Sequence, residues 1–219
     1  MTGKGRWFRP RTLWFPTWRT LLLLCSTVLP TMLWAVSQLH PWLSMTVPVA
    51  DAKYAVVEGW VPDRVVGEAL VWAKTHETRM FFTTGIPLEQ GKFLSNYPTF
   101  AEICADTLKR MGADPVKVKP APAMKVDLER TRAMATGLKQ VLDGMNIPPG
   151  ERKINLFTSG PHAFRSRMHF QSVLGPEWQV GVISVPPVGY VPGSWWKYSE
   201  GVKGVIEEVV AILGQWFST

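Results

Sequence analysis

The chain has 219 residues, of which 24 are basic and 17 acidic, and its formal net charge is +7. Five of the basic residues and none of the acidic ones precede residue 20, so the rest of the chain holds 19 basic and 17 acidic residues. The basic character therefore belongs to a short tail and does not indicate nucleic-acid binding, and the later lysines lack the interleaved aromatic residues that base stacking requires. Two cysteines and four scattered histidines exclude a disulfide scaffold and a zinc-ligand spacing.

Residues 20–39 form an uncharged apolar run that follows a basic tail at residues 1–19. As a helix rising about 1.5 Å per residue, this run would be about 30 Å long, the thickness of a bilayer's hydrocarbon core. Because basic residues stay on the cytoplasmic side, we expect a single-pass cell-membrane anchor with a cytoplasmic N-terminus and a periplasmic or otherwise extracytoplasmic globular domain. A cleaved signal peptide is the alternative, with Ala35-Val36-Ser37 as a weak cleavage site.

Residues 40–52 have little periodicity and are expected to link this helix to an α/β domain at residues 53–219. From residue 53 onward, short apolar runs alternate with amphipathic stretches, which is typical of repeated β-α units. Strands are predicted at residues 53–60, 79–85, 115–122, 153–159 and 179–185. The third carries prolines, which cannot donate to a β-ladder, so it is placed at an edge. The sequence thus predicts a Rossmann-like three-layer domain with a mostly parallel five-stranded sheet, preceded by one transmembrane helix.

The helix predicted at residues 127–145 has the clearest periodicity in the chain. Its apolar and small residues recur at three- and four-residue spacing on one face: Leu128, Thr131, Ala135, Leu138, Leu142 and Met145. Asp127 is expected to be its N-cap, because its carboxylate can accept hydrogen bonds from the free N–H groups of the first turn. Other helices are predicted at residues 63–76, 97–111 and 195–217, and after the strand at 153–159 as far as residue 174.

The strand at residues 153–159 runs into a Ser-Gly-Pro turn and then a basic helix that carries His162 and Arg165. In an open parallel sheet, the carboxyl ends of the strands and the amino ends of the following helices form a ligand crevice that favours anions. Right-handed crossovers bring the other strand ends to the same edge. The predicted ligand-binding residues are Glu58, Gly59, Asp63, Thr84, Gly85, Asp127, Arg130, Thr131, Ser159, His162 and Arg165.

Among these residues, Arg165 is predicted to be the anion clamp and His162 a second donor or the catalytic acid/base. An unperturbed histidine pKa of about 6.5 suits proton transfer near neutrality. The hydroxyl side chains Thr84, Thr131 and Ser159 would orient the ligand, and the carboxylates Glu58 or Asp127 would bind a hydroxyl or a metal. A serine-hydrolase mechanism is not expected, because the G-x-S-x-G elbow is absent.

Two alternatives stay open for the carboxylates, and no metal is assigned. Glu58, Asp63 and Asp127 would suit a hard divalent cation if they gathered in space. Otherwise they are one N-cap and two solvated carboxylates. The residues leave the identity of any cofactor open.

The strand-end residues resemble a known family. An acidic residue followed by glycine after the first strand, Thr84-Gly85 after the second, Thr131 at the third helix and the pattern T-S-x-x-H-x-x-R-[AS] are similar to the YdcF/SanA/ElyC-like family, long catalogued as a domain of unknown function. The last pattern is present as Thr158, Ser159, His162, Arg165 and Ser166. The resemblance covers roughly residues 52–217, with a VEGW first-strand signature, and departs from the family where its usual Glu-Asn pair is replaced by Ala133-Met134.

The resemblance implies a role in cell-envelope biogenesis, with a small anionic ligand that is phosphorylated or nucleotide-like. The sequence itself shows no reaction. A second hypothesis is a non-catalytic scaffold or accessory subunit of a membrane-protein complex. Its basis is the content of 11 tryptophans. Five lie around the apolar run and two stand together before the last helix: Trp7, Trp14, Trp18, Trp34, Trp42 and Trp195-Trp196. Such residues anchor interfaces as readily as they line pockets.

Overall fold

The computed structural model describes residues 17–217, so the predicted basic tail lies outside the described residues except for residues 17–19. The chain divides into two units, Met1–Gln38 and Leu39–Thr219. The first unit contains most of α1 (Trp18–Leu43), the one helix among the described residues that is long and apolar enough to cross a membrane. Its hydroxyl groups bond within the helix: Thr27 Oγ1 donates to Leu23 O at 2.8 Å and Thr31 Oγ1 to Thr27 O at 2.8 Å. Such internal bonds satisfy the polar groups that a lipid environment would leave without a partner.

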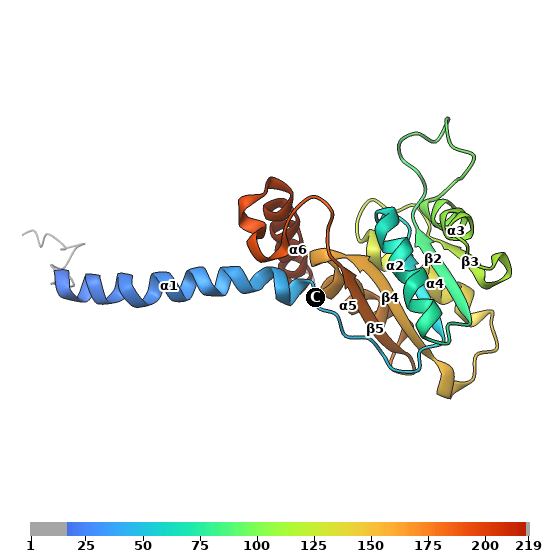
Figure 1. Cartoon of the computed structure of the whole chain (residues 1–219), viewed down its shortest axis with the longest axis horizontal. Coiled ribbons are helices and arrows are strands. Elements are labelled where there is room, and N and C mark those ends of the chain that lie inside the picture. Colours follow the sequence, from blue (N-terminus) through green and yellow to red (C-terminus); the bar gives the residue numbers. More distant parts are fainter. Residues whose placement is uncertain (1–16, 218–219) are drawn as a thin grey trace, which may run out of the picture. The chain divides into compact units, whose positions relative to one another are not determined.

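The second unit is built on a five-stranded sheet in which every pair of neighbouring strands is parallel (Figure 1). The strands are β1 (Tyr54–Glu58), β2 (Met80–Gly85), β3 (Val118–Pro122), β4 (Lys153–Ser159) and β5 (Gln179–Val185). Their order is β3-β2-β1-β4-β5, which confirms the fold class and places the proline-containing third strand at an edge. The order reverses between β1 and β4, so the crevice that binds ligands in such sheets is expected above these two strand ends.

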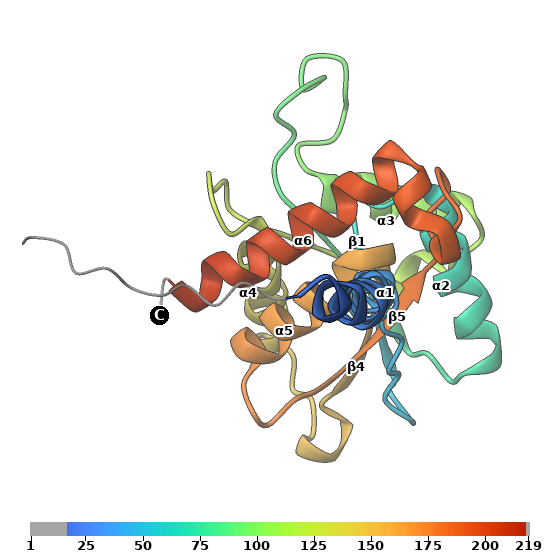
Figure 2. The ribbon, with the colours of Figure 1, turned by 90° about the vertical axis from the view of Figure 1, so that its left-hand side faces the viewer.

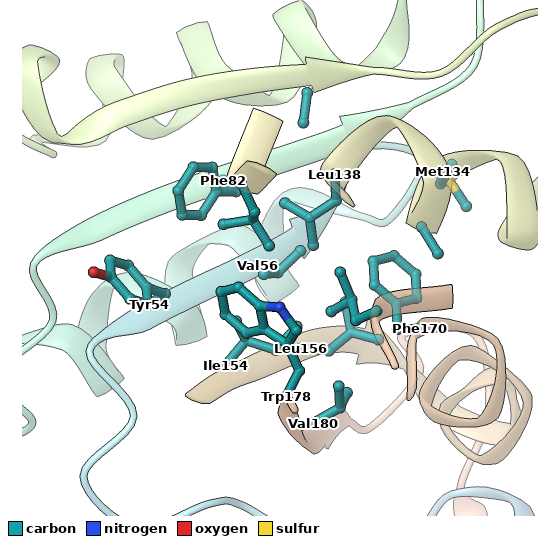
Figure 3. Packing of buried hydrophobic residues seen from close by; sticks show 14 of the residues in the cluster. Tyr54, Val56, Phe82, Met134, Leu138, Ile154, Leu156, Phe170, Trp178 and Val180 are labelled. Atoms are coloured by element: carbon teal, nitrogen blue, oxygen red, sulfur yellow. The ribbon is translucent and has the colours of Figure 1, made fainter. Parts of the chain in front are cut away.

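Two helices cover each face of the sheet, which completes the three-layer architecture. Residues of α2 (Asp63–Thr75) and α3 (Phe100–Arg110) pack in one apolar cluster with the strands, and residues of α4 (Arg130–Asp143) and α5 (Ala163–Leu174) pack in the other. Figure 3 shows the second cluster, with Phe82, Leu156 and Phe170 pointing into the space between sheet and helices. All three side chains are 0% exposed. Each contributes roughly 1.5–3 kcal/mol to folding by leaving water.

The start of α4 corrects one prediction. The helix begins at Arg130, three residues after Asp127, and its N-cap is Glu129. Glu129 adopts a left-handed backbone conformation, with φ of 55°, and its side chain makes no capping bond. The prediction that Asp127 caps the helix is therefore wrong, because the chain turns only at Glu129. Leu128, expected on the buried face, is 82% exposed for the same reason.

The predicted helix at residues 195–217 is also divided. A 3₁₀ segment, η4 (Pro192–Lys197), is followed by α6 (Ser199–Phe217) (Figure 2). The break falls at Tyr198, whose backbone is extended (φ −121°, ψ 132°). The other 3₁₀ segments are η1 (Pro115–Lys117), η2 (Pro149–Glu151) and η3 (Gly160–His162).

The segment predicted as a linker is bound to the sheet over part of its length. Residues 40–43 belong to α1, and Val47 forms an antiparallel bridge with Val182 of β5. Val49 N donates to Asn155 Oδ1 at 2.8 Å, and Asn155 Nδ2 donates to Val49 O at 3.1 Å. These bonds explain the one amide side chain in β4. They also explain Gly181, where a Cβ would lie 2.5 Å from Val49 N.

Candidate functional site

A pocket of about 580 Å³ lies at the carboxyl edge of the sheet. It is lined by residues that follow the first four strands and by two residues of α6: Trp60, Gly85, Ile86, Phe100, Asp127, Leu128, Glu129, Arg130, Thr131, Met134, His162, Arg165, Glu207 and Glu208. This is where strand order and crossover handedness direct a ligand in an open parallel sheet.

One wall of the pocket is a charged cluster of His162, Arg165 and Glu208. His162 Nδ1 lies 2.6 Å from Glu208 Oε1. Arg165 donates to both oxygens of the same carboxylate, from Nε to Oε2 at 2.6 Å and from Nη2 to Oε1 at 2.9 Å. The third guanidinium nitrogen, Nη1, donates to Thr131 Oγ1 at 3.2 Å. Arg165 therefore holds a carboxylate of its own chain in the bidentate geometry that guanidinium groups form with anions.

The pKa of Glu208 reflects these contacts. Burial by itself would raise the pKa, but the hydrogen bonds from Arg165 and His162, together with their positive charge, lower it to about 2. Glu208 is thus a carboxylate at every physiological pH, although the residue is only 7% exposed.

The bond to Glu208 determines how the imidazole of His162 is used. A carboxylate only accepts hydrogen bonds, so in this contact Nδ1 donates to Glu208, as in the acid-histidine pairs of general acid/base sites. Arg165 Nη2 also lies 2.9 Å from Nδ1, but its acceptor is then Glu208 Oε1. Nε2 is the ring nitrogen that is not bonded to Glu208. It lies 3.4 Å from Thr131 Oγ1 and 3.8 Å from Glu58 Oε1. The Trp60 ring packs edge-on against the imidazole, at 4.8 Å between centroids.

Below the charged cluster lies a set of buried polar side chains that we call the pocket floor: Glu58, Thr84, Thr158 and Ser166. Glu58 is 0% exposed and accepts hydrogen bonds from Thr158 Oγ1 and, at 2.9 Å, from Ser166 Oγ. Glu58 is paired in register with Thr84 of β2, whose Oγ1 is buried and has no hydrogen-bond partner among residues 17–217. The floor thus combines a carboxylate that accepts hydrogen bonds from two hydroxyls with a third hydroxyl that makes no hydrogen bond among the described residues.

Next to the charged cluster, the pocket is lined by the first turn of α4, which contributes Arg130 and Thr131. The first N–H groups of a helix have no intrahelical acceptor, and Glu129 does not cap them. Arg130, the first residue of the helix, is exposed and forms no ion pair among residues 17–217. Arg132, in contrast, forms an ion pair with Glu129, with 3.7 Å between Nη1 and Oε2. Helix dipole, free amides and an uncompensated guanidinium together make this side favourable for an anion.

Two predicted glycines have a packing role. A Cβ on Gly59 would lie 2.4 Å from Phe100 O, and one on Gly85 would lie 2.4 Å from Ala101 N. Only glycine lets the ends of β1 and β2 approach the start of α3 so closely. Gly85 lines the pocket through its backbone, and Gly59 does not line it.

The structure brings together six of the predicted residues in the pocket lining: Gly85, Asp127, Arg130, Thr131, His162 and Arg165. Glu58 and Thr84 of the floor are fully buried and are not in the lining, but Glu58 Oε1 lies 3.8 Å from His162 Nε2. Gly59, Asp63 and Ser159 are not part of the lining; Asp63 is exposed at the first residue of α2. In the described part of the chain no three His, Cys, Asp or Glu side chains gather in a way that would hold a metal ion, so the carboxylates Glu58, Asp63 and Asp127 stay apart.

Glu208 was missed in the sequence. Its signal is the spacing of α6, where the buried residues Gly201, Val205, Glu208 and Ile212 follow one another at intervals of four, three and four. A carboxylate at a position where the helical period requires an apolar residue indicates a buried partner for its charge.

The arrangement suits proton exchange at His162 Nε2 beside an anion held at the start of α4. No family model, curated protein or solved structure matches the chain.

Proposed function

We propose that the chain is a membrane-anchored domain on the envelope side of the cell membrane that binds a small anionic ligand, phosphorylated or nucleotide-like, in the pocket at the carboxyl edge of the sheet. The apolar helix α1 supports the anchor, and the basic residues before it support the orientation with a cytoplasmic N-terminus. The resemblance of the strand-end residues to the YdcF/SanA/ElyC-like family supports a role in envelope biogenesis.

The observation that carries the proposal is the uncapped start of α4, with the unpaired Arg130, facing a pocket of about 580 Å³. Arg165, the residue expected to clamp the anion, is already engaged by Glu208. Arg130 and the amide groups of residues 130–132 therefore take the anion. Arg165 contributes by holding Glu208 and Thr131 in place.

His162 is proposed to exchange a proton with the bound ligand. Its Nδ1 donates to Glu208, so Nε2 is the ring nitrogen left to meet the ligand. The carboxylate of Glu58 lies 3.8 Å from this nitrogen. Proton exchange between Nε2 and the ligand requires no other side chain of the protein.

Binding is tested by calorimetric titration of the full chain in detergent micelles with inorganic phosphate and pyrophosphate. Arg130→Gln is expected to weaken binding by roughly tenfold or more, since a hydrogen bond to a charged group is worth about 1.5–3 kcal/mol. The matched control is Arg132→Gln, two residues along the same helix, also exposed but not in the pocket lining. Equal weakening by both substitutions would show non-specific attraction and contradict the proposal.

Proton exchange is tested in the same titration, repeated in buffers that differ in ionisation enthalpy. A dependence of the binding heat on the buffer measures the protons taken up, and His162→Gln should abolish it. If the parent protein binds phosphate without buffer dependence, His162 has no part in proton exchange.

The scaffold hypothesis keeps one specific observation in its favour. The loop between β2 and α3 projects away from the domain in both views (Figures 1 and 2). This loop contains Phe93 and Leu94, which are 101% and 94% exposed. Of the tryptophan pair, Trp195 is buried and Trp196 is half-exposed. Extraction in mild detergent followed by native mass measurement separates the two functions: a stoichiometric partner protein supports a scaffold, and a lone chain with a bound metabolite supports the ligand site.

A further inference from the structure

Helix α6 has two different faces. The face toward the domain carries Val205, Glu208 and Ile212, all buried. The other face carries Ile206, Val210 and Leu213, whose side chains are 54%, 61% and 46% exposed. The spacing of four and three residues places all three on one side of the helix, as an unbroken apolar stripe.

The charges of α6 are confined to its first half. Glu200, Lys203, Glu207 and Glu208 lie in that half, and residues 209–217 carry no charged side chain. A solvated helix face is normally polar, and contiguous exposed aliphatic side chains mark a surface that contacts something other than water.

The inner face of α6 packs where the chain enters the domain. Leu39 and Leu43 belong to the same apolar cluster as Val205 and Ile212. Leu39 follows the apolar run of α1 directly in the sequence. Packed helices lie about 8–10 Å apart, and the interfacial layer on each side of a bilayer is roughly 5–8 Å thick. Chain continuity alone therefore keeps α6 within reach of the interface from which residue 39 emerges.

The segment before α6 supports the same location. Trp196 and Tyr198 are 48% and 38% exposed. Tryptophan and tyrosine are enriched at membrane–water interfaces, because their rings are apolar at one end and polar at the other.

We propose that α6 is an interfacial helix that lies on the bilayer, with Ile206, Val210 and Leu213 buried among the lipid chains and the opposite face packed on the domain. The stripe contacts lipid, because it is an apolar surface close to the place where the chain leaves the membrane. This inference rests on the membrane anchor of the proposed function and is independent of what the pocket binds.

The same helix carries Glu208, so contact with the bilayer acts on the pocket. Glu208 lies on the inner face and holds both His162 and Arg165. A helix seated on the membrane keeps this carboxylate in place, so lipid contact orders the charged cluster.

The test uses the full chain in phospholipid vesicles, with Cys25→Ala and Cys104→Ala as background. Val210→Cys is labelled with an environment-sensitive fluorophore, and Val71→Cys on α2 is the matched control, since the two valines are 61% and 58% exposed. We expect the label at position 210 to emit at shorter wavelength, to lose several-fold in quenching by aqueous iodide and to be quenched by lipids that carry a spin label near the headgroup. The label at position 71 should behave as in water.

Two outcomes would overturn the inference. Equal iodide quenching at positions 210 and 71 would show that the stripe faces water. A second copy of the chain would be the occupant of the stripe if two results came together. Protection of the label at position 210 from iodide would appear only as the protein-to-lipid ratio rises, and unlabelled Val210→Cys chains would form disulfide cross-links. If Val210→Cys does not fold, Ile206→Cys reports on the same stripe. Phosphate titration of the vesicle-bound protein reads the pocket separately, so failure of either proposal is distinguished from failure of the other.

Discussion

The pocket floor and the charged cluster both contain a buried glutamate close to the imidazole of His162, but they satisfy it in opposite ways. In the floor, Glu58 is solvated by the hydroxyls of Thr158 and Ser166. In the cluster, Glu208 is neutralised by Arg165 and bonded to His162. Neutral donors solvate a buried carboxylate without changing their own charge. A cluster of charged groups is stable only while every partner is present and charged. The floor therefore holds its carboxylate with neutral donors, whereas the cluster is expected to lose stability at acid pH, where Glu208 becomes protonated.

The largest effect is expected for Glu208→Ala. The substitution leaves the partly buried guanidinium of Arg165 without its carboxylate, so the free energy of unfolding should fall by about 3 kcal/mol, the lower end of the range for a broken buried pair. Urea denaturation measures this loss. Replacing both partners, Glu208→Leu with Arg165→Met, should recover most of it, because no charge then lacks a partner. A loss below about 1 kcal/mol for Glu208→Ala would show that the pair behaves as a solvated surface pair.

Lowering the pH should remove the stabilisation that Glu208 gives to the charged cluster. Variants without Glu208 should not show this loss. The pKa of Glu208 in the folded protein is lowered from 4.5 to about 2. A lowered pKa means that the stabilisation is complete above about pH 4.5 and is lost as the pH falls toward about 2. The loss amounts to about 3 kcal/mol at most. Urea denaturation of the parent protein and of Glu208→Gln at a series of pH values should show this difference shrinking across that window. A constant difference would contradict the assignment.

In the floor, Thr158→Val should cost about 1–3 kcal/mol, because Glu58 loses one of its two donors and is fully buried. The exposed Thr75→Val on α2 is the matched control and should change stability little. Denaturation of both variants measures the difference. If the two variants lose the same amount, hydroxyl solvation of Glu58 does not stabilise the floor.

The smallest effect is expected for Thr84→Val, and its sign is opposite. The hydroxyl of Thr84 is buried without a partner, so removing it at nearly constant shape should raise the free energy of unfolding by about 1 kcal/mol. If the hydroxyl contacts the ligand instead, phosphate binding should weaken in the same variant. A destabilised variant with normal binding would mean that the hydroxyl has a partner after all.

Much of the fold follows from local patterns. The strands at residues 153–159 and 179–185 were predicted with the bounds they have, since apolar and β-branched runs between turn residues are a local signal. The edge position of β3 followed from its prolines. The start of α4 was predicted wrongly, because the left-handed turn before it falls at Glu129, where no glycine signals it.

The candidate site was predicted only in part. His162, Arg165, Thr131 and Arg130 meet because right-handed crossovers bring the strand ends to one edge. The partner of the first two, Glu208, lies 46 and 43 residues further along the chain. No short-range spacing connects residues so far apart.

From the sequence alone came the apolar helix, the strands and the edge of the sheet where polar residues gather, because periodicity, turn residues and crossover handedness act over short stretches of chain. Only the tertiary structure decided that Arg165 is bound by Glu208, that Arg130 forms no ion pair within the part of the chain that the structure describes, and that α6 turns an apolar stripe outward. These are outcomes of packing between distant segments, in which a charge takes the nearest partner that burial allows.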